Sequence, residues 1–204
     1  MISKPDLNYE HQIWSACNYI AGLDEAGRGA LAGPVFVGAV ILPKENPYLL
    51  NKLSEVHDSK QLTPSKRQQL TPHIKEIALA WGIGSSTAEE IDKLGIVPAT
   101  RLAASRAIEA MNFIPDFLLT DFRLELPELD MPQTALVKGD ARSLSIASAS
   151  ILAKTARDEL MSNLDKQFSA YNFPSHKGYG TALHRKKIKQ LGHSAIHRKT
   201  FKIK

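Results

Sequence analysis

Compact apolar runs alternate along the chain with longer stretches whose apolar residues recur every three or four positions. Compact runs bounded by turn residues predict buried strands, and the longer spacing predicts helices. Because strands come first and then alternate with helices, the pattern favours one mixed α/β domain over residues 1–204. The predicted strands cover residues 19–24, 35–42, 78–86, 117–122 and 134–140.

Turn and capping residues set the boundaries of several elements. The glycine-rich turn after the first strand predicts a hairpin with the second. Thr63 followed by Pro64 is typical of a helix start, and Gly95 is typical of a helix end. The predicted helix over 143–164 is rich in alanine and serine in its first half, and such small side chains let a helix lie close against a sheet. Further helices are predicted over 88–95, 97–113 and 181–191.

Charge is unevenly distributed along the chain. Residues 166–204 hold ten Lys or Arg and no Asp or Glu, whereas the first 165 residues hold 16 basic and 21 acidic side chains. Such a one-sided segment favours a polyanionic partner, although a solvated basic helix without any ligand has the same composition. Aromatic rings, which stacking on bases requires, lie in the same segment with four histidines: Phe168, Tyr171, Phe173, Tyr179, His176, His184, His193 and His197. We therefore interpret residues 166–204 as a basic helical segment that binds nucleic acid.

The remaining composition argues against several other classes of protein. Cys17 is the only cysteine, so an intramolecular disulfide and a multi-cysteine zinc site are excluded, and it has no assignable role beyond burial. The N-terminus lacks the apolar core of a signal peptide, and the longest mostly apolar run, residues 30–42, is too short to span a bilayer. We expect a cytoplasmic protein without membrane contact, and we take it to be a monomer.

Four acidic residues interrupt apolar surroundings at or just past predicted strand ends: Asp24, Glu25, Asp121 and Asp140. Reactive groups of open α/β sheets gather along strand ends, so neighbouring strands would bring these carboxylates together. They would repel one another unless a cation neutralised them. Oxygen ligands without clustered cysteines favour Mg²⁺ or Mn²⁺ over zinc. The sequence therefore predicts a metal site at this edge of the sheet.

Each of these acidic residues also has a plainer interpretation. The first two could form a turn or cap, the third could be an exposed strand end, and the last could cap the following helix. Neighbouring side chains in a regular strand point to opposite faces, so Asp24 and Glu25 serve one site only if the strand ends there or if one contributes its backbone carbonyl. Asp158 is a weaker candidate, because Lys154 lies four residues earlier and can pair with it on a helix surface.

A glycine-rich loop, "GRGALAG", follows directly after the first acidic pair. Its spacing does not fit a dinucleotide-binding turn, and no Gly-Lys-Ser/Thr follows to make a P-loop. A bound divalent cation would reverse the local charge, so that carboxylates and a phosphate bind the same centre from opposite sides. Two such ions roughly 4 Å apart activate a water and stabilise the leaving oxygen, which is the arrangement of a phosphodiester hydrolase.

Six sequence blocks follow one another along roughly residues 20–201: "GLDEAGRGALAGPVFVGAVIL", "DSKQLTPSKR", "GIVPATRLAASRAI", "LLTDF", "VKGDARSLSIASASILAKTARDEL" and "FPSHKGYGTALH". Together they resemble the motifs of the bacterial ribonuclease HII family. The resemblance implies a ribonuclease H-like fold, with a central mixed sheet flanked by helices. It further implies hydrolysis of RNA in RNA/DNA hybrids and at single ribonucleotides embedded in DNA, leaving 3′-hydroxyl and 5′-phosphate ends.

The resemblance also implies roles for individual residues. The family's catalytic and metal-binding carboxylates fall on the same four residues that the strand-end argument selects. A 2′-hydroxyl is the group that separates RNA from DNA, and the family's motif that contacts it falls on Gly27, Arg28 and Gly29. The tyrosine that stacks at the RNA–DNA junction falls on Tyr179, for which a plain turn aromatic is the alternative.

The sequence departs from the family pattern at a few positions. Ala30 replaces a usual proline, and Phe122 replaces a usual glycine, which puts the geometry of the preceding aspartate in question. Lys60 and Lys177 could contact phosphates or could be ordinary surface lysines. Only a short stretch precedes Asp24, so we expect no room for the additional N-terminal domain of the related ribonuclease HIII.

Two functions of other kinds stay open at this point. The first is a non-catalytic hybrid- or DNA-binding protein that uses the basic segment, and the presence of all four carboxylates argues against it. The second is a different two-metal nuclease on a related fold, such as an exonuclease. The Gly-Arg-Gly motif and Tyr179 argue against that alternative.

Overall fold

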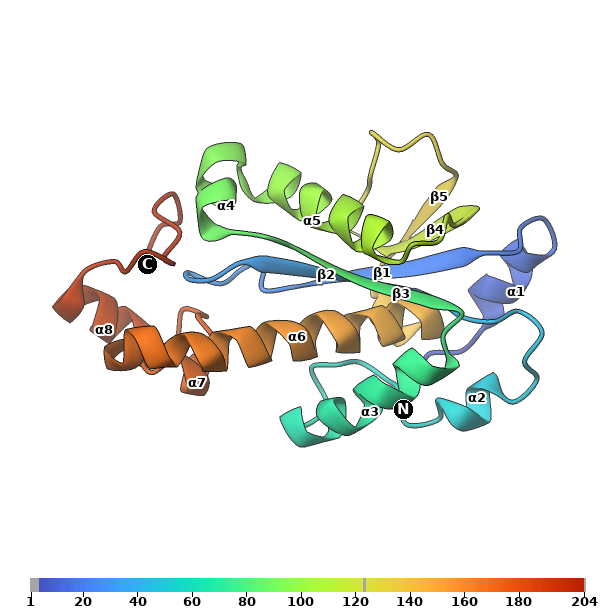
Figure 1. The fold of residues 1–204 in the computed structure, drawn as a ribbon, viewed down its shortest axis with the longest axis horizontal. Helices are drawn as coiled ribbons and strands as arrows, with labels where there is room; N and C mark the ends of the chain where they lie inside the picture. Colours follow the sequence, from blue (N-terminus) through green and yellow to red (C-terminus); the bar gives the residue numbers. More distant parts are fainter. Residues whose placement is uncertain (1–3, 123, 204) are drawn as a thin grey trace.

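The centre of the molecule is a five-stranded sheet with strand order β3-β2-β1-β4-β5 (Figure 1). The computed structural model describes residues 4–122 and 124–203, so residues 1–3 and 204 of the predicted 1–204 domain, and residue 123, lie outside the described residues. The strands are β1 (Ile20–Ala26), β2 (Val35–Ile41), β3 (Ala80–Ser86), β4 (Phe117–Asp121) and β5 (Gln133–Leu136).

Strand pairing makes the sheet mixed. β1 pairs antiparallel with β2, and β2 pairs antiparallel with β3, which confirms the predicted hairpin and meander. β4 lies on the other side of β1 in parallel, and β5 continues in parallel beyond it. Because β1 and β4 are parallel neighbours, their carboxyl ends meet at the same edge of the sheet.

Helices cover both faces of the sheet (Figure 1). α5 packs on β3 and β2 on one face, while α6 lies along β1 and β2 on the other face with α3 beside it. The predicted architecture, a mixed sheet flanked by helices, is confirmed. The described α-helices are α1 (Asn8–Trp14), α2 (Leu49–Lys52), α3 (Pro64–Ile77), α4 (Ala88–Leu94), α5 (Ile96–Ala110), α6 (Leu144–Phe168), α7 (Phe173–His176) and α8 (Ala182–Leu191).

Small residues allow the helices to approach the sheet closely, as the alanine- and serine-rich pattern predicts. A Cβ added to Gly38 of β2 would lie 2.3 Å from the carbonyl oxygen of Ala149 in α6. On the opposite face, a Cβ added to Gly84 of β3 would lie 2.1 Å from the carbonyl oxygen of Ala103 in α5. Both distances are far below van der Waals contact, so larger residues would push the layers apart.

The long helix α6 begins at Leu144, within one residue of its predicted start, with Ser143 as its N-cap, and it ends later than predicted. Ser143 accepts the N–H of Ile146 at 3.2 Å. Glu10 of α1 is buried against the same helix start and accepts a hydrogen bond from Ser143 Oγ at 2.6 Å. The helix continues beyond residue 164 to Phe168, because Met161, Leu164 and Phe168 extend one apolar stripe into a local core.

The chain after α6 folds back onto the body of the molecule. Tyr171 and Phe173 are buried in that local core, with their rings stacked at 5.6 Å. Their faces are therefore closed to nucleic-acid bases, which corrects the expectation that these rings stack on a substrate. α8 confirms the predicted helix over 181–191, capped by Thr181. The described part of the chain contains no helix of the length and apolar character needed to cross a membrane.

Candidate active site

Three carboxylates from two parallel strands converge at one edge of the sheet. Asp24 and Glu25 lie near the end of β1, and Asp121 is the last residue of β4. One oxygen of each lies within 4.8 Å of the others. β1 continues to Ala26 along β2, but its pairing with β4 ends at Leu23. The strand therefore ends at the acidic pair only on the β4 side, where both side chains reach Asp121. We call these three residues the carboxylate cluster.

Asp24 is the most deeply buried member of the cluster, with 5% of its surface exposed. Its Oδ1 accepts the N–H of Glu25 at 2.7 Å, and Ser150 of α6 hydrogen-bonds to the same side chain. Burial raises the pKa of Asp24 well above its usual range, and the charges of Glu25 and Asp121 raise it further. The ionised carboxylate is therefore electrostatically unfavourable unless a cation joins it.

The ionised form of Glu25 is also electrostatically unfavourable. Burial raises its pKa and Asp121 adds to this, against the opposing effect of Arg28, whose guanidinium lies 3.8 Å from the Glu25 carboxylate. The Oε2 atom of Glu25 is buried, and no described residue donates a hydrogen bond to it. This oxygen is therefore available to a cation.

The donors of this cluster fit a hard divalent cation. Carboxylate oxygens are the ligands that Mg²⁺ and Mn²⁺ prefer. A dication would neutralise the repulsion that raises the pKa of Asp24, and it would occupy the unpartnered oxygen of Glu25. The residues therefore fit the metal that the sequence predicts.

Asp121 is held in place from the neighbouring turn. The N–H of Gly139 donates to its Oδ1 at 2.8 Å. Phe122 is 55% exposed, so its ring is not packed inside the carboxylate cluster. The replacement of the usual glycine by this bulky residue therefore leaves Asp121 inside the carboxylate cluster.

Asp140 lies beside the cluster and is not one of the three converging groups. The prediction that a strand reaches it is wrong: β5 ends at Leu136, Lys138 adopts a left-handed conformation, and a 3₁₀ turn (Gly139–Ala141) carries Asp140. The side chain is buried, and its Oδ2 lies 3.3 Å from the Nζ of Lys60. Burial disfavours charge on Lys60, but Asp140 and a second carboxylate outweigh this effect and raise its pKa.

A chain of hydroxyl groups, which sequence analysis missed, supports Asp24. Ser150, its hydrogen-bond partner, lies 2.9 Å from Ser59 through their Oγ atoms, and both serines are buried. Ser59 directly precedes Lys60 in the "DSK" block, so this block contacts the site twice. Its position inside a quoted motif was the only available signal, because the contact joins residues far apart in sequence.

The Gly-Arg-Gly loop (residues 27–29) follows β1 directly. Gly27 has φ +87°, and a Cβ there would lie 1.8 Å from the Nε of Arg157. A Cβ on Gly29, by contrast, meets no described atom within 4 Å. The fold itself therefore requires glycine at position 27, whereas at position 29 the missing side chain leaves open space outside the loop.

Tyr179 is half-buried in the turn before α8. Its N–H donates to the carbonyl of His176 at 2.8 Å. Its ring lies 5.1 Å from the Cζ of Arg157 and 5.4 Å from the Nζ of Lys154. These contacts hold the ring in one position against two cations of α6.

Three histidines of the basic segment are buried rather than exposed to a polyanion: His176, His184 and His197, which we call the histidine cluster. The rings of His176 and His184 stack at 4.2 Å. Burial lowers the pKa of all three, and for His197 to about 4. They are therefore neutral near pH 7 and do not add to the positive charge of the segment, which corrects the interpretation made from sequence.

Hydrogen bonds assign a neutral form to the two linked rings of this cluster. The carbonyl of Tyr179 lies 3.0 Å from Nδ1 of His184 and can only accept, so that nitrogen carries the proton. The Nε2 of His184 then accepts from Nε2–H of His197 at 3.0 Å. Nδ1 of His197 accepts the N–H of Ser194 at 2.9 Å. If His184 also carried a proton on Nε2, that N–H would point at the Nε2–H of His197, and the hydrogen bond between the two rings would be lost.

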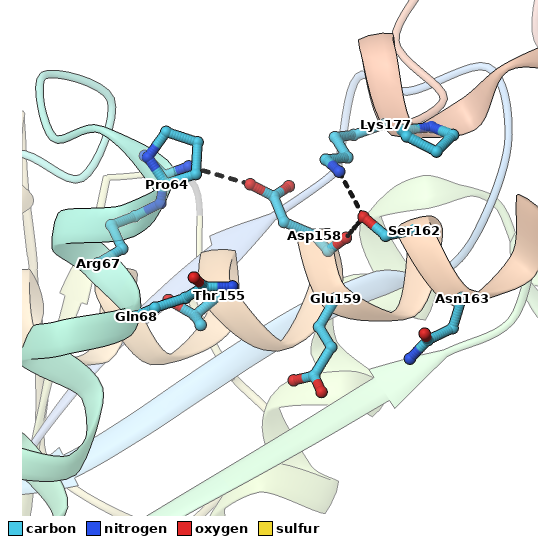
Figure 2. A pocket seen from close by; sticks show the side chains of 10 residues that line it. Pro64, Arg67, Gln68, Thr155, Asp158, Glu159, Ser162, Asn163 and Lys177 are labelled. Atoms are coloured by element: carbon cyan, nitrogen blue, oxygen red, sulfur yellow. Dashed lines mark hydrogen bonds and ion pairs between the residues drawn. The ribbon is translucent and has the colours of Figure 1, made fainter.

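Asp158 lies outside the carboxylate cluster. It pairs with Lys154 at 2.6 Å, which confirms the predicted pairing, and with Arg67 of α3 at 3.0 Å. Figure 2 shows it at the wall of a cavity of about 250 Å³ between α3 and α6. Lys177 lines the same cavity and donates from Nζ to the Oγ of Ser162.

A mixed sheet of this order, with carboxylates gathered where two parallel strands end, defines a nuclease of the ribonuclease H-like class. The chain belongs to the ribonuclease HII family, whose model matches residues 21–204. It is similar to a ribonuclease HII from Dehalococcoides mccartyi, with 54% identity over 89% of this chain and 84% of that protein. A ribonuclease HII from Chlorobium phaeovibrioides is 44% identical over 97% of this chain and 96% of that protein.

A solved structure has the same fold over most of its length. The PCNA:RNase HII complex from Archaeoglobus fulgidus matches with a TM-score of 0.75 and 25% identity, over 91% of this chain and 96% of that chain. Family membership makes this chain a ribonuclease H that acts on nucleic acid and depends on a metal ion.

Proposed function

We propose that this enzyme cuts the RNA strand of RNA/DNA hybrids and also cuts 5′ of single ribonucleotides embedded in duplex DNA. The products would carry 3′-hydroxyl and 5′-phosphate ends. The observation that carries the proposal is the carboxylate cluster, whose burial is electrostatically unfavourable without a cation, directly beside the Gly-Arg-Gly loop. A bound cation would reverse the local charge and let such a site hold the scissile phosphate for cleavage.

The four carboxylates have distinct parts in this proposal. Asp24, Glu25 and Asp121 would hold two Mg²⁺ or Mn²⁺ ions, and Asp140 would complete the set. When bound, the pair of ions supplies an activated water and a charge that stabilises the leaving oxygen. Lys60 would hold Asp140 in its buried position and keep a positive charge near the substrate phosphate.

Residues around the cluster would select the substrate. Gly27, Arg28 and Gly29 would contact the 2′-hydroxyl through backbone, and the open space outside Gly29 gives the ribose room. Tyr179, with its ring held against two cations, would stack at the RNA–DNA junction. The basic segment 166–204 would bind duplex phosphates, and we further propose a monomeric, cytoplasmic enzyme.

The test uses a DNA duplex with one internal ribonucleotide, incubated with the protein and either Mg²⁺, Mn²⁺ or EDTA. We expect one nick on the 5′ side of the ribonucleotide with either metal, and none in EDTA. An all-DNA duplex of the same sequence is the matched control and should stay intact. Tight binding without any metal-dependent cut would reject the catalytic proposal, and trimming from duplex ends would indicate an exonuclease.

A further inference from the structure

Two fully buried arginines, Arg157 of α6 and Arg198 beyond α8, lie under the Gly-Arg-Gly loop. Within the described chain, neither forms an ion pair with a carboxylate. Burial and, second to it, the positive charge of Arg157 lower the pKa of Arg198 to about 9. Buried cations without counter-ions are unfavourable unless hydrogen bonds replace the lost water.

Backbone carbonyls supply those hydrogen bonds for Arg198 and most of them for Arg157, whose buried Nη1 has no partner within the described chain. Arg198 donates from Nη2 to the oxygen of Gly27 at 2.7 Å and from Nη1 to the oxygen of Arg28 at 2.8 Å. Its Nε donates to the oxygen of Gly33 at 2.9 Å. Arg157 donates to the carbonyls of Pro34 and Ala32, between the Gly-Arg-Gly loop and β2, at 2.9 and 3.2 Å. The planar guanidinium of Arg198 thus joins the Gly-Arg-Gly loop to Gly33, near the other end of the connection between β1 and β2.

The bonds from Arg198 orient two successive peptide planes. In a trans peptide, the C=O of one residue and the N–H of the next point in opposite directions. The oxygens of Gly27 and Arg28 point inward at the guanidinium, so the N–H groups of Arg28 and Gly29 point outward. A Cβ added to Gly29 would meet no described atom within 4 Å, so the space beside this residue is open to a ribose.

We propose that Arg198 is a positioning residue that aims these two N–H groups at the substrate ribose and thereby sets the preference for a ribonucleotide over a deoxyribonucleotide. This inference rests on the proposed function, since it assumes that the loop reads the 2′-hydroxyl. Arg198 itself touches no substrate. Its position near the end of the chain makes the C-terminal segment part of the recognition device as well as a source of positive charge.

The experiment compares binding of two duplexes that differ by one 2′-hydroxyl, measured by fluorescence anisotropy in EDTA so that neither is cut. Both duplexes carry the same phosphates, so the ratio of their Kd values isolates ribose recognition and is independent of the folded fraction. Arg198→Lys keeps the charge but cannot hold three carbonyls. We expect it to reduce the preference for the ribonucleotide duplex about fivefold, the effect of one hydrogen bond, with all-DNA binding unchanged.

A second variant, Arg198→Gln, removes the buried charge and keeps the test available if Arg198→Lys does not fold. Arg101→Lys is the matched control, because the half-buried Arg101 of α5 also donates to a backbone carbonyl, that of Glu125. Its preference should equal that of the wild type. An unchanged ratio in folded Arg198 variants, or equal weakening of both duplexes, would overturn the inference. A wild type without preference and without metal-dependent cleavage would overturn the proposed function instead.

Discussion

The carboxylate cluster and the histidine cluster are both groups of like titratable side chains buried in one fold. In the histidine cluster, burial keeps the rings neutral, and neighbouring groups of the chain donate to or accept from the linked nitrogens. In the carboxylate cluster, burial raises the pKa of two members, and one oxygen of Glu25 has no donor within the described chain.

The difference separates structure from function. A buried polar group that the chain itself satisfies stabilises the fold, whereas an unsatisfied oxygen inside a cluster of like charges is available to a cation. The histidines hydrogen-bond within the turn that carries Tyr179, whereas we propose that the carboxylates bind a cation and, through it, a phosphate. Substitutions in the two clusters should therefore change stability in opposite directions.

The largest expected effect is on catalysis. Asp24→Asn removes a proposed metal ligand and should lower the rate of the metal-dependent nick by about a thousandfold, because ligands of a catalytic cation contribute several kcal/mol. Single-turnover cleavage of the one-ribonucleotide duplex measures this rate. The matched control is Glu90→Gln, since Glu90 pairs with Arg106 and caps α4, and it should keep full activity. Cleavage by Asp24→Asn at the wild-type rate would remove Asp24 from the site.

The next effect is on stability. His184→Leu leaves the carbonyl of Tyr179 and the Nε2–H of His197 without partners. We expect the free energy of unfolding to fall by about 3 kcal/mol, measured by urea denaturation at pH 7. Because His184 supports the Tyr179 turn, KM should rise more than kcat falls. A stability equal to that of the wild type would show that these hydrogen bonds contribute nothing.

A smaller effect depends on pH. The pKa of His197 is about 4 in the fold against an ordinary 6.5, so between these values the unfolded chain binds a proton that the folded chain excludes. Stability is therefore complete above pH 6.5 and falls as the pH drops toward 4. Between pH 7 and 5 we expect a loss of up to about 1.4 kcal/mol per pH unit for each such histidine. Urea denaturation of wild type and His197→Phe should give a shallower slope for the variant, and equal slopes would contradict this assignment.

The smallest effect concerns the departure from the family pattern beside the cluster. Phe122 is mostly exposed, and Gly139 rather than Phe122 holds Asp121. Phe122→Ala should therefore change the free energy of unfolding by less than about 0.5 kcal/mol. Its rate at saturating substrate should stay within about twofold of wild type, and a larger loss would mean that the ring contacts the substrate.

Local signals in the sequence predicted much of this molecule. Thr63, Gly95 and Ser143 mark helix boundaries because caps act over three or four residues. Lys154 and Asp158 pair across one helical turn for the same reason. The acidic residues stood out because each interrupts an apolar run, and three of the four converge.

Contacts between distant parts of the chain were beyond such reasoning. The 3₁₀ turn that carries Asp140 follows Lys138, which adopts a left-handed conformation. Lysine rarely adopts this conformation, so the sequence does not predict the turn. The histidines looked like part of a charged segment, because burial is decided by packing of the whole segment on α6. Arg198 donates a hydrogen bond to the backbone carbonyl of Arg28, about 170 positions earlier in the chain. Only the folded structure reveals that contact.

The central claim is that the carboxylate cluster is destabilising until a cation joins it. The most direct measurement is urea denaturation of wild type and Asp24→Asn, each in EDTA and in Mn²⁺. We predict that in EDTA the variant is more stable by about 1 kcal/mol, because a neutral amide removes a buried charge from a repulsive group. Saturating Mn²⁺ should then stabilise the wild type more and reverse the order. A variant that is less stable than wild type in EDTA, with no gain for wild type from Mn²⁺, would contradict the account.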